Sequence, residues 1–354
     1  MSPREALRGA GAFLLLPLSL VPLYFAVPRL RGASDAPSVE RRALPVPAIH
    51  PTNAELARWQ ALPAFRGAVP VLVYHGINDI GDHYSVSQGA FTEQMEMLKR
   101  AGFQTISIGQ YVRFLQGDAR GLPPRPILIT FDDGRLDSYR GADKVLAAYG
   151  FRATMFVIVG QTEAANGFYL GWDELRRMAD SGRWDIQEHA GVGHVNVQID
   201  AAGHIGPAYA YKRYLGDGKM ESYDAYRRRV IDDVTWAKPT LSEHIPGFSP
   251  WSFAVPFGDF GQDNTNDRRI PRFLNRFLAR NFLAVFLTWP PRYTRQQSDP
   301  SQLGRIEVHS DTTTYQLYHA LDVRMPGFAK AAALPAPAEP AHHEQRAHQT
   351  RKSR

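Results

Sequence analysis

Short runs of β-branched and other apolar residues alternate with segments of helical periodicity between residues 70 and 321. This alternation predicts an α/β fold with a largely parallel sheet, either a barrel or an open wound sheet. About eight strands over roughly 250 residues favour a distorted (β/α) barrel of about seven or eight mostly parallel strands. The expected strands are Pro70–His75, Gln104–Ile106, Ile127–Phe131, Ala153–Val159, Trp184–Glu188, Ser252–Val255, Leu283–Thr288 and Arg305–Val308. The expected helices are Thr92–Ala101, Ser138–Tyr149, Asp173–Ser181, Ser222–Glu243, Arg269–Asn281 and Thr313–Leu321.

Charge and cysteine usage restrict the classes of function. The chain has 354 residues, a formal net charge of +6 and no cysteine. Neither a disulfide framework nor a thiolate metal site can therefore form. We see no run of lysine and arginine residues, interleaved with aromatic residues, that would indicate a nucleic-acid surface. The positive charge instead suits an acidic envelope polymer or an anionic lipid surface.

The N-terminal region predicts contact with a membrane. Gly9–Val27 is an uncharged, leucine-rich stretch that follows Arg4 and Arg8, and it is just long enough to span a hydrocarbon core of ~30 Å as a helix. It is either an uncleaved anchor or a signal peptide. Arg29 and Arg31 separate it from a small-residue cleavage site, which favours the anchor. Both interpretations place the rest of the chain outside the cytoplasm.

Composition divides the chain into four parts. Residues 1–30 form the anchor or signal segment, and the Pro/Ala-rich residues 31–68 are expected to form a linker with a helical hint at 53–60. Residues 69–328 form the folded domain. Residues 329–354 are rich in alanine and proline and then in histidine, glutamine and arginine, which predicts a disordered basic tail.

Two adjacent carboxylates mark the end of the strand expected at Ile127–Phe131. Asp132 and Asp133 follow this apolar run directly, and Gly134 comes next. Burying neighbouring carboxylates is costly unless their charge is compensated. Successive strand residues point to opposite sides, so one carboxylate can bind a metal while the other handles a proton. From these residues alone, a solvated Asp-Asp-Gly turn is the alternative.

Two histidines follow the strand expected at Trp184–Glu188. His189 and His194 are five residues apart, a spacing that suits neither one helix face nor one strand face. The rings converge only if the backbone turns between them, and Gly191 and Gly193 permit such a turn. Two imidazoles and a carboxylate would make a three-ligand site with open positions, as hydrolytic metals require.

These motifs resemble the polysaccharide deacetylases of carbohydrate esterase family 4, with the NodB-type domain. Thr130–Gly134 matches the first motif of the family in full. The resemblance implies that Asp132 is the catalytic base and that Asp133, His189 and His194 bind a metal. The five-residue histidine spacing is similar to that of the biofilm poly-N-acetylglucosamine deacetylase branch. Val71–Ile77 and Phe91–Ser107 also look like that branch, and the similarity spans about residues 69–321.

The third and fifth motifs of the family match only in part. The third motif usually reads Arg-x-Pro-x-Gly, but Ala254 stands here in the place of the arginine that orients the base. Some other group would then hold Asp132, and His75 is one choice. The fifth motif fits Ile306–His309 loosely, which implies His309 as the general acid, with His75 as the alternative. The resemblance also implies substrate contacts at Tyr74, Pro256, Phe257 and Gly258.

The loop that follows the second metal histidine is long and rich in glycine and tyrosine. Loops of this length in compact domains are often functional. Tyr209, Tyr211 and Tyr214 either stack on sugar rings or cover the mouth of the barrel, and the sequence leaves both interpretations open.

The resemblance implies metal-dependent hydrolysis of N-acetyl groups from an N-acetylglucosamine-containing polysaccharide, with acetate as a product. A biofilm exopolysaccharide ranks ahead of peptidoglycan or chitin as substrate. The expected cofactor is a divalent ion, with zinc as first choice and cobalt, nickel or iron as alternatives. The expected partners are the polymer and, through the N-terminal segment, a membrane; a monomer that binds no nucleic acid is expected. One competing hypothesis is a catalytically impaired carbohydrate-binding module, motivated by Ala254 and by the loose fit of the fifth motif. The other is a hydrolase of another amide or ester.

Overall fold

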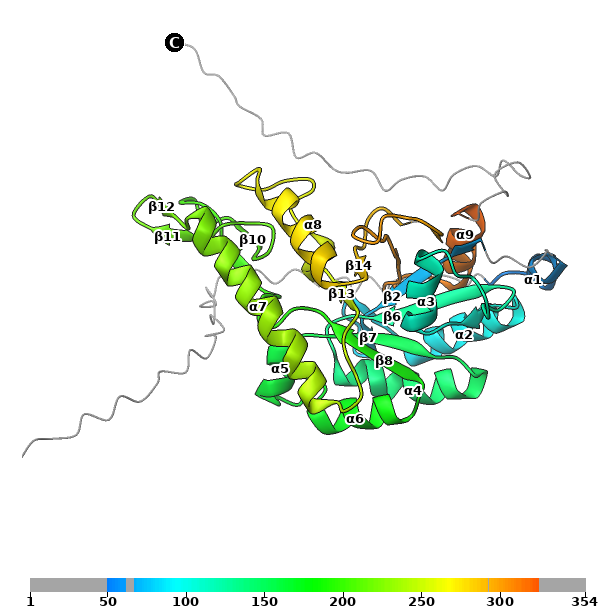
Figure 1. Cartoon of the computed structure of the whole chain (residues 1–354). Coiled ribbons are helices and arrows are strands. Elements are labelled where there is room, and N and C mark those ends of the chain that lie inside the picture. The colour runs from blue at the N-terminus through cyan, green and yellow to red at the C-terminus, as the bar shows by residue number, and fades with distance from the viewer. Residues whose placement is uncertain (1–49, 62–66, 292, 325–354) are drawn as a thin grey trace, which may run out of the picture. The chain divides into compact units, whose positions relative to one another are not determined.

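The structure of the chain is a computed structural model that describes residues 50–61, 67–291 and 293–324 (Figure 1). The expected anchor or signal segment, most of the expected linker and the expected basic tail lie outside these residues. Within the described ranges, no helix combines the length and the apolar character that crossing a bilayer requires.

A parallel sheet forms the centre of the domain (Figure 1). Its strands follow the order β14-β13-β8-β7-β6-β2-β16, and β5 pairs with the start of β6. All eight runs expected to be strands lie in this sheet, and the predicted parallel (β/α) architecture is confirmed. The strands are β2 (Val71–Tyr74), β5 (Gln104–Thr105), β6 (Pro126–Phe131), β7 (Ala153–Val157), β8 (Trp184–Glu188), β13 (Ser252–Ala254), β14 (Ala284–Phe286) and β16 (Ile306–Glu307).

The segment that leads into β16 curls the sheet into a distorted barrel. The N–H of Val285 on β14 donates to the carbonyl of Pro300 at 2.7 Å, and the N–H of Leu287 donates to the carbonyl of Leu303 at 2.8 Å. A few residues later, Ile306 and Glu307 pair with β2. Residues 300–307 therefore connect the two ends of the strand order.

Alternation along β6 determines which side chains fill the barrel. All six residues of β6 are buried, because neighbouring elements cover both of its faces. Leu128 packs with Phe156 of β7 and Phe286 of β14 in one buried cluster. Thr130 and Asp132 continue this every-second-residue series toward the carboxyl end of the strand. The fold thus turns Asp132 toward the inside of the barrel.

Helices flank the sheet at the positions that periodicity predicts, with two additions. They are α2 (Gln88–Arg100), α4 (Leu136–Tyr149), α6 (Trp172–Asp180), α7 (Tyr223–His244), α8 (Ile270–Asn281) and α9 (Thr314–Arg324). The additions are α3 (Ile108–Leu115) and α5 (Val159–Ala164). A sequence signal for α3 exists, because Ser107 and Gln110 form a capping box at its start.

One helix lies inside the stretch that was expected to be a linker. In α1 (Asn53–Ala61), Leu56 and Trp59 are buried, and the Trp59 ring centroid lies 4.9 Å from that of Phe103. Arg58 forms an ion pair with Asp322 at 2.5 Å. The packed domain therefore begins before residue 69, and the expected boundary was too late. Two large apolar side chains in a nine-residue helix are too few for a clear periodic signal.

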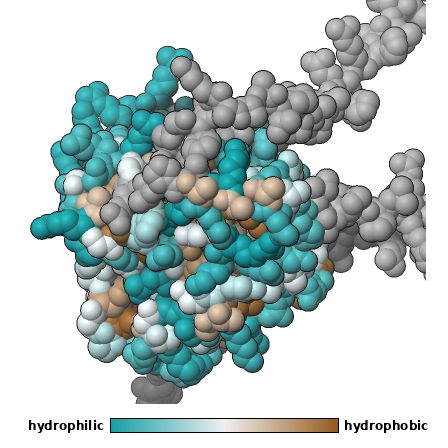
Figure 2. Space-filling model, turned by 90° about the vertical axis from the view of Figure 1, so that its right-hand side faces the viewer, coloured by the Kyte–Doolittle hydropathy of each residue, from teal (hydrophilic) through white to brown (hydrophobic). Residues whose placement is uncertain are grey.

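Short two-stranded elements complete the fold and lie outside the main sheet. They are β1 (Ala68–Val69) with β15 (Thr294–Arg295), β3 (Gly76–Ile77) with β4 (Ser85–Val86), β9 (Asn196–Gln198) with β10 (Ile205–Pro207), and β11 (Tyr214–Gly216) with β12 (Lys219–Met220). The face of the molecule seen in Figure 2 is mostly hydrophilic, with apolar residues in small separate groups. Scattered apolar residues of this kind are normal on a protein surface.

Candidate active site

The two aspartates sit where β6 ends and the chain turns toward α4. Asp132 is buried, with 2% of its surface exposed. Asp133 has a φ of 72°, and Gly134 has a φ of 71°. A positive φ is uncommon for a residue other than glycine, and such conformations cluster at functional sites. The left-handed turn, rather than the strand alternation expected from the sequence, gives the two carboxylates different surroundings.

Arg305 holds Asp132 in a bidentate ion pair inside the barrel. The Nη1 and Nη2 atoms of Arg305 donate to the two carboxylate oxygens of Asp132 at 2.7 and 2.6 Å. The arginine is fully buried and also donates to the carbonyl of Leu287 and to the hydroxyl of Thr130. Burial opposes ionisation of Asp132, but the charges of Arg305 and His189 outweigh it and hold the pKa of this carboxyl below its ordinary value. The described structure thus supplies a partner for Asp132 that the sequence analysis did not identify.

Asp133, His189 and His194 converge as candidate metal ligands. The Oδ1 atom of Asp133 lies 3.5 Å from the Nε2 atom of each histidine, and one donor atom from each residue falls within 4.8 Å of the others. Ligand atoms about 2 Å from a common zinc ion lie about 3–4 Å apart. The Oδ1 atom of Asp133 is buried and has no hydrogen-bond partner. A cation would satisfy this atom, so the three residues fit a divalent metal ion.

The protonation states of these residues also suit a metal. Burial and the charge of His189 lower the pKa of His194 to about 4, so its ring is neutral at pH 7. The Nδ1 atom of His189 donates to the carbonyl of Ala254 at 2.8 Å, which directs Nε2 toward the carboxylates. Burial opposes charge on His189, yet Asp132 and Asp133 raise its pKa above the ordinary value. The same negative field that favours a proton here favours a cation.

A carboxylate on α7 holds the turn between the two histidines. Asp233 accepts hydrogen bonds from the backbone N–H groups of Gly191, Val192 and Gly193 at 3.0, 2.6 and 3.2 Å, and from the hydroxyl of Tyr209 at 2.6 Å. A Cβ atom at Gly193 would lie 2.3 Å from the Tyr209 ring and 2.8 Å from Asp233. The turn therefore requires glycine for close approach, and Asp233 fixes the position of His194.

Replacing one carboxylate oxygen of Asp233 should weaken metal binding. In Asp233→Asn, the amide NH2 faces backbone N–H groups that need an acceptor, so the turn that carries His194 loosens. We expect metal affinity to fall about 10–100-fold, as for other residues that support ligands. Competition with a chelating dye measures the affinity. Asp232→Asn is the matched control, because Asp232 is the exposed neighbour on the same helix, and it should bind metal like the parent protein.

A cavity of about 310 Å³ opens above the metal candidates. Its lining combines predicted and unpredicted residues. The predicted ones are His75, Asp132, Asp133, His189, His194, Phe257 and Gly258; the others are Tyr84, Arg135, Thr288 and Glu307. The ring centroid of Phe257 lies 4.2 Å from that of His194. Phe257 is 44% exposed and forms an apolar wall of this cavity.

The two histidines considered as general acid occupy different places. His75 lines the cavity with Asp132, and its Nδ1 atom is buried without a hydrogen-bond partner. The His309 ring instead stacks on His83, with centroids 4.3 Å apart, and its Nε2 atom lies 3.4 Å from Glu307. Burial lowers the pKa of His309, which disfavours the protonated form that an acid needs.

Several residues expected at the substrate lie in the core. The Tyr74 side chain is fully buried, and its hydroxyl donates to Gln94 at 2.9 Å, so core packing occupies the position suggested for a substrate contact. Pro256 is buried at the start of the turn that carries Phe257. Tyr209 and Tyr211 are buried as well. Neither lines the catalytic cavity, and Tyr209 lines a separate pocket with Asp233.

Comparison with known proteins places the domain in a family. A model of the polysaccharide deacetylase family matches residues 119–269. The matched part contains β6, β7 and β8, both aspartates and both candidate metal histidines. The chain carries a polysaccharide deacetylase domain of the NodB type, in agreement with the resemblance seen in its motifs.

Individual relatives support this assignment. The chain is 23% identical over 270 residues to poly-beta-1,6-N-acetyl-D-glucosamine N-deacetylase of Escherichia coli O157:H7, an alignment that covers 72% of this chain and 38% of the relative. It is 29% identical over 232 residues to the protein of the same name in Staphylococcus epidermidis, covering 65% and 70% of the two chains. A solved de-N-acetylase from Aggregatibacter actinomycetemcomitans has a TM-score of 0.62 at 21% identity, over 72% of this chain and 100% of that one. The chain thus spans less than two fifths of the length of the Escherichia coli relative.

Proposed function

We propose that this chain is a metal-dependent N-deacetylase that hydrolyses acetamide groups of a β-1,6-linked N-acetylglucosamine polymer. The observation that carries the proposal is the pairing of a three-ligand metal candidate with an ionised, arginine-held carboxylate in one cavity. Asp132 Oδ2 and His189 Nε2 are 3.9 Å apart, so a base and a metal ligand face the same space. The names of the two deacetylase relatives support the choice of polymer.

The donor set favours zinc over a harder cation. Two imidazoles and one carboxylate leave coordination positions open for water and substrate, as in catalytic zinc sites, and cobalt, nickel and iron remain alternatives. A bound ion of this kind supplies Lewis-acid polarisation of the acetamide carbonyl and acidifies water. Asp133, His189 and His194 would hold it.

The residues of the chain carry out the proton transfers. Asp132 is ionised at neutral pH and each of its oxygens keeps a second lone pair beyond the Arg305 bond, so it accepts the proton of the attacking water. The water oxygen adds to the acetamide carbon, and the carbon–nitrogen bond then breaks. His75, which lines the same cavity, donates the proton that the departing sugar amine takes. Acetate and a glucosamine unit result.

The proposed location is outside the cytoplasm. The apolar stretch Gly9–Val27, with arginines on both sides, supports a membrane anchor, or alternatively a cleaved signal peptide. Each deacetylation leaves an amine that is cationic at neutral pH. The polymer would therefore gain positive charge at the cell surface, where it meets anionic material.

Acetate release from oligosaccharides of defined linkage tests the proposal. We expect release from β-1,6-linked N-acetylglucosamine oligomers to exceed release from β-1,4-linked ones, to stop after chelation and to return with zinc. Release from the β-1,4 series alone would indicate a peptidoglycan- or chitin-type substrate. Binding of oligomers without release under any metal would contradict the proposal and favour a carbohydrate-binding module.

Single substitutions separate the two candidate acids. We expect His75→Ala to lower kcat by about 10²–10⁴-fold, the usual cost of losing a positioned acid, while metal affinity stays unchanged. His309→Ala removes a ring that does not line the cavity and contacts it through Glu307 and Tyr84, so its effect should be below about tenfold. Steady-state acetate release measures both. A larger loss in His309→Ala would reverse the assignment.

A further inference from the structure

A groove between α7 and α8 gathers six arginines on the surface of the domain. We call it the arginine groove and define it by Arg227, Arg268, Arg269, Arg272, Arg276 and Arg280. It has a volume of about 780 Å³, and the half-buried rings of Tyr223, Phe273 and Phe277 form its floor. It shares no lining residue with the catalytic cavity. The groove is therefore a separate feature that the proposed chemistry does not use.

The arginines at the start of α8 and along it stand in a row because of their spacing. Phe273 and Phe277 lie between them, so this is a run of arginine and aromatic residues that the sequence analysis overlooked. Arg269, Arg272, Arg276 and Arg280 recur every three or four residues, so they follow one face of the helix for about 16 Å. The opposite face of α8 packs into the core through Ile270, Leu274 and Leu278, which are buried. Lys238 of α7 donates to the carbonyl of Asn281 at 2.7 Å and ties the two helices together. The row of charges is thus held on a packed element.

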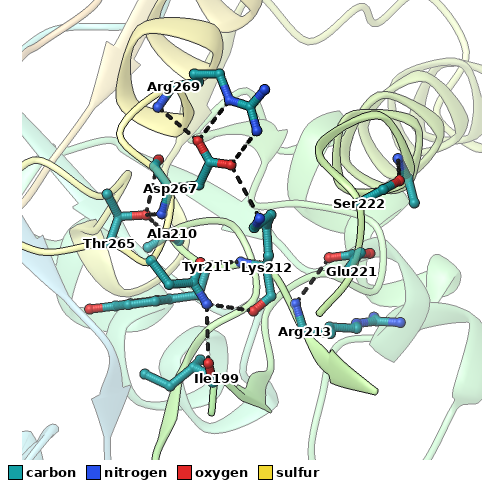
Figure 3. A network of polar contacts seen from close by, with 12 residues as sticks. Ile199, Ala210, Tyr211, Lys212, Arg213, Glu221, Ser222, Thr265, Asp267 and Arg269 are labelled. Atoms are coloured by element: carbon teal, nitrogen blue, oxygen red, sulfur yellow. Dashed lines mark hydrogen bonds and ion pairs between the residues drawn. The ribbon is translucent and has the colours of Figure 1, made fainter. Parts of the chain in front are cut away.

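Few acidic groups balance these charges. Asp267 accepts two hydrogen bonds from the Arg269 guanidinium and one from its backbone N–H, and it also pairs with Lys212, as Figure 3 shows. Asp224 lies 3.7 Å from Arg227. Within the described part of the chain, no ion pair joins Arg268, Arg272, Arg276 or Arg280 to a carboxylate. Four uncompensated cations in one groove repel each other, so the groove favours an anionic partner.

Arginine and phosphate match in geometry as well as charge. The planar guanidinium donates two parallel hydrogen bonds to phosphate oxygens, and it is less strongly hydrated than the lysine ammonium. Several such groups in a row need a partner with many phosphates in reach at once. The favoured interpretation of the apolar N-terminal stretch, an uncleaved anchor, would keep the domain near a membrane, whose lipid headgroups provide such an array at high local concentration.

We propose that the arginine groove binds the phosphate groups of an anionic phospholipid surface and so holds the domain against the membrane. The groove shares no lining residue with the catalytic cavity, so lipid phosphates in the groove would not occupy the position of the substrate. This contact does not depend on the proposed deacetylase activity.

Binding to lipid nanodiscs tests the proposal. The full chain is kept in a neutral detergent, and its affinity is measured for discs of phosphatidylcholine alone and for discs with about 30% phosphatidylglycerol. The ratio of the two affinities isolates the anionic contribution, because any apolar N-terminal contact is common to both discs. Each arginine near an anionic surface contributes about fivefold, so Arg272→Gln, Arg276→Gln and Arg280→Gln together should lower the ratio about a hundredfold. Added salt should lower it as well.

A second triple variant controls for net charge. Arg113→Gln, Arg140→Gln and Lys144→Gln remove the same charge from exposed positions on α3 and α4. We expect this variant to keep the parent ratio, and both variants to keep the parent unfolding temperature and acetate release. Equal losses in the two variants, or a parent ratio near one, would overturn the proposal. Groove-dependent binding of a DNA oligomer without any preference for phosphatidylglycerol would overturn it in favour of a different polyanion.

Discussion

Replacing Arg305 by methionine is expected to destabilise the fold by about 3–5 kcal/mol, because it leaves the buried Asp132 carboxylate without its partner. Arg305 is fully buried and makes both hydrogen bonds to Asp132. Loss of its charge should also raise the pKa of Asp132, since burial then acts with less opposition. The acid limb of the kcat/KM profile should therefore move to higher pH. Urea unfolding and the pH profile measure the two effects.

Two further variants separate charge from geometry. Arg305→Lys keeps the charge but cannot form the paired, planar contact, so we expect a smaller loss of stability than in Arg305→Met and a lasting loss of activity. The double variant Arg305→Met with Asp132→Asn removes both charges and should recover part of the stability without activity. If Arg305→Met unfolds at the parent urea concentration and keeps the parent pH profile, Arg305 does not hold the base.

Asp132→Asn should lower kcat/KM by about 10²–10⁴-fold, the range that a positioned general base contributes. The amide keeps the shape of the carboxylate but takes up no proton. In the parent protein, the pKa of Asp132 lies below its ordinary value, so the base stays ionised at neutral pH. For the same reason, its stabilising pair with Arg305 is present above the unfolded-state pKa and is lost only as the pH falls through the lower folded-state pKa.

Metal affinity distinguishes Asp132 from its neighbour. Asp132→Asn should bind metal nearly as well as the parent, because Asp132 is not among the three converging donor residues. Asp133→Asn should lose both activity and metal affinity. Equal metal loss in the two variants would contradict the division of roles between base and ligand.

The arrangement of strands could be predicted because residues that favour turns or break strands mark the ends of the apolar runs. The run at 127–131 follows Pro126 and ends in two carboxylates and a glycine, and the structure places a strand at Pro126–Phe131. Strand carboxyl ends meet at one edge of a parallel barrel, so His75, Asp132, Asp133, His189 and His309 could be expected in one site. All of them except His309 line the same cavity. Because active sites of parallel barrels form at the carboxyl ends of the strands, the strand pattern also predicted where the site lies.

The groups that hold this site could not be predicted in the same way. Arg305 contacts Asp132 across 173 positions of sequence, and an arginine just before a short strand looks like any surface cation. Asp233 resembles one of several solvated acids on a long helix, yet it binds three consecutive N–H groups. Such partners depend on how distant segments meet in three dimensions, which no local pattern encodes.

The central claim is that Asp133, His189 and His194 hold a catalytic divalent ion beside Asp132. A titration of the chelated protein with zinc, followed by acetate release from β-1,6-linked N-acetylglucosamine oligomers, tests it most directly. We predict that activity rises with added zinc, levels off at a single ion per chain and does not rise in Asp133→Asn at the same concentrations. Full activity in the chelated protein, or an unchanged titration in Asp133→Asn, would contradict the claim.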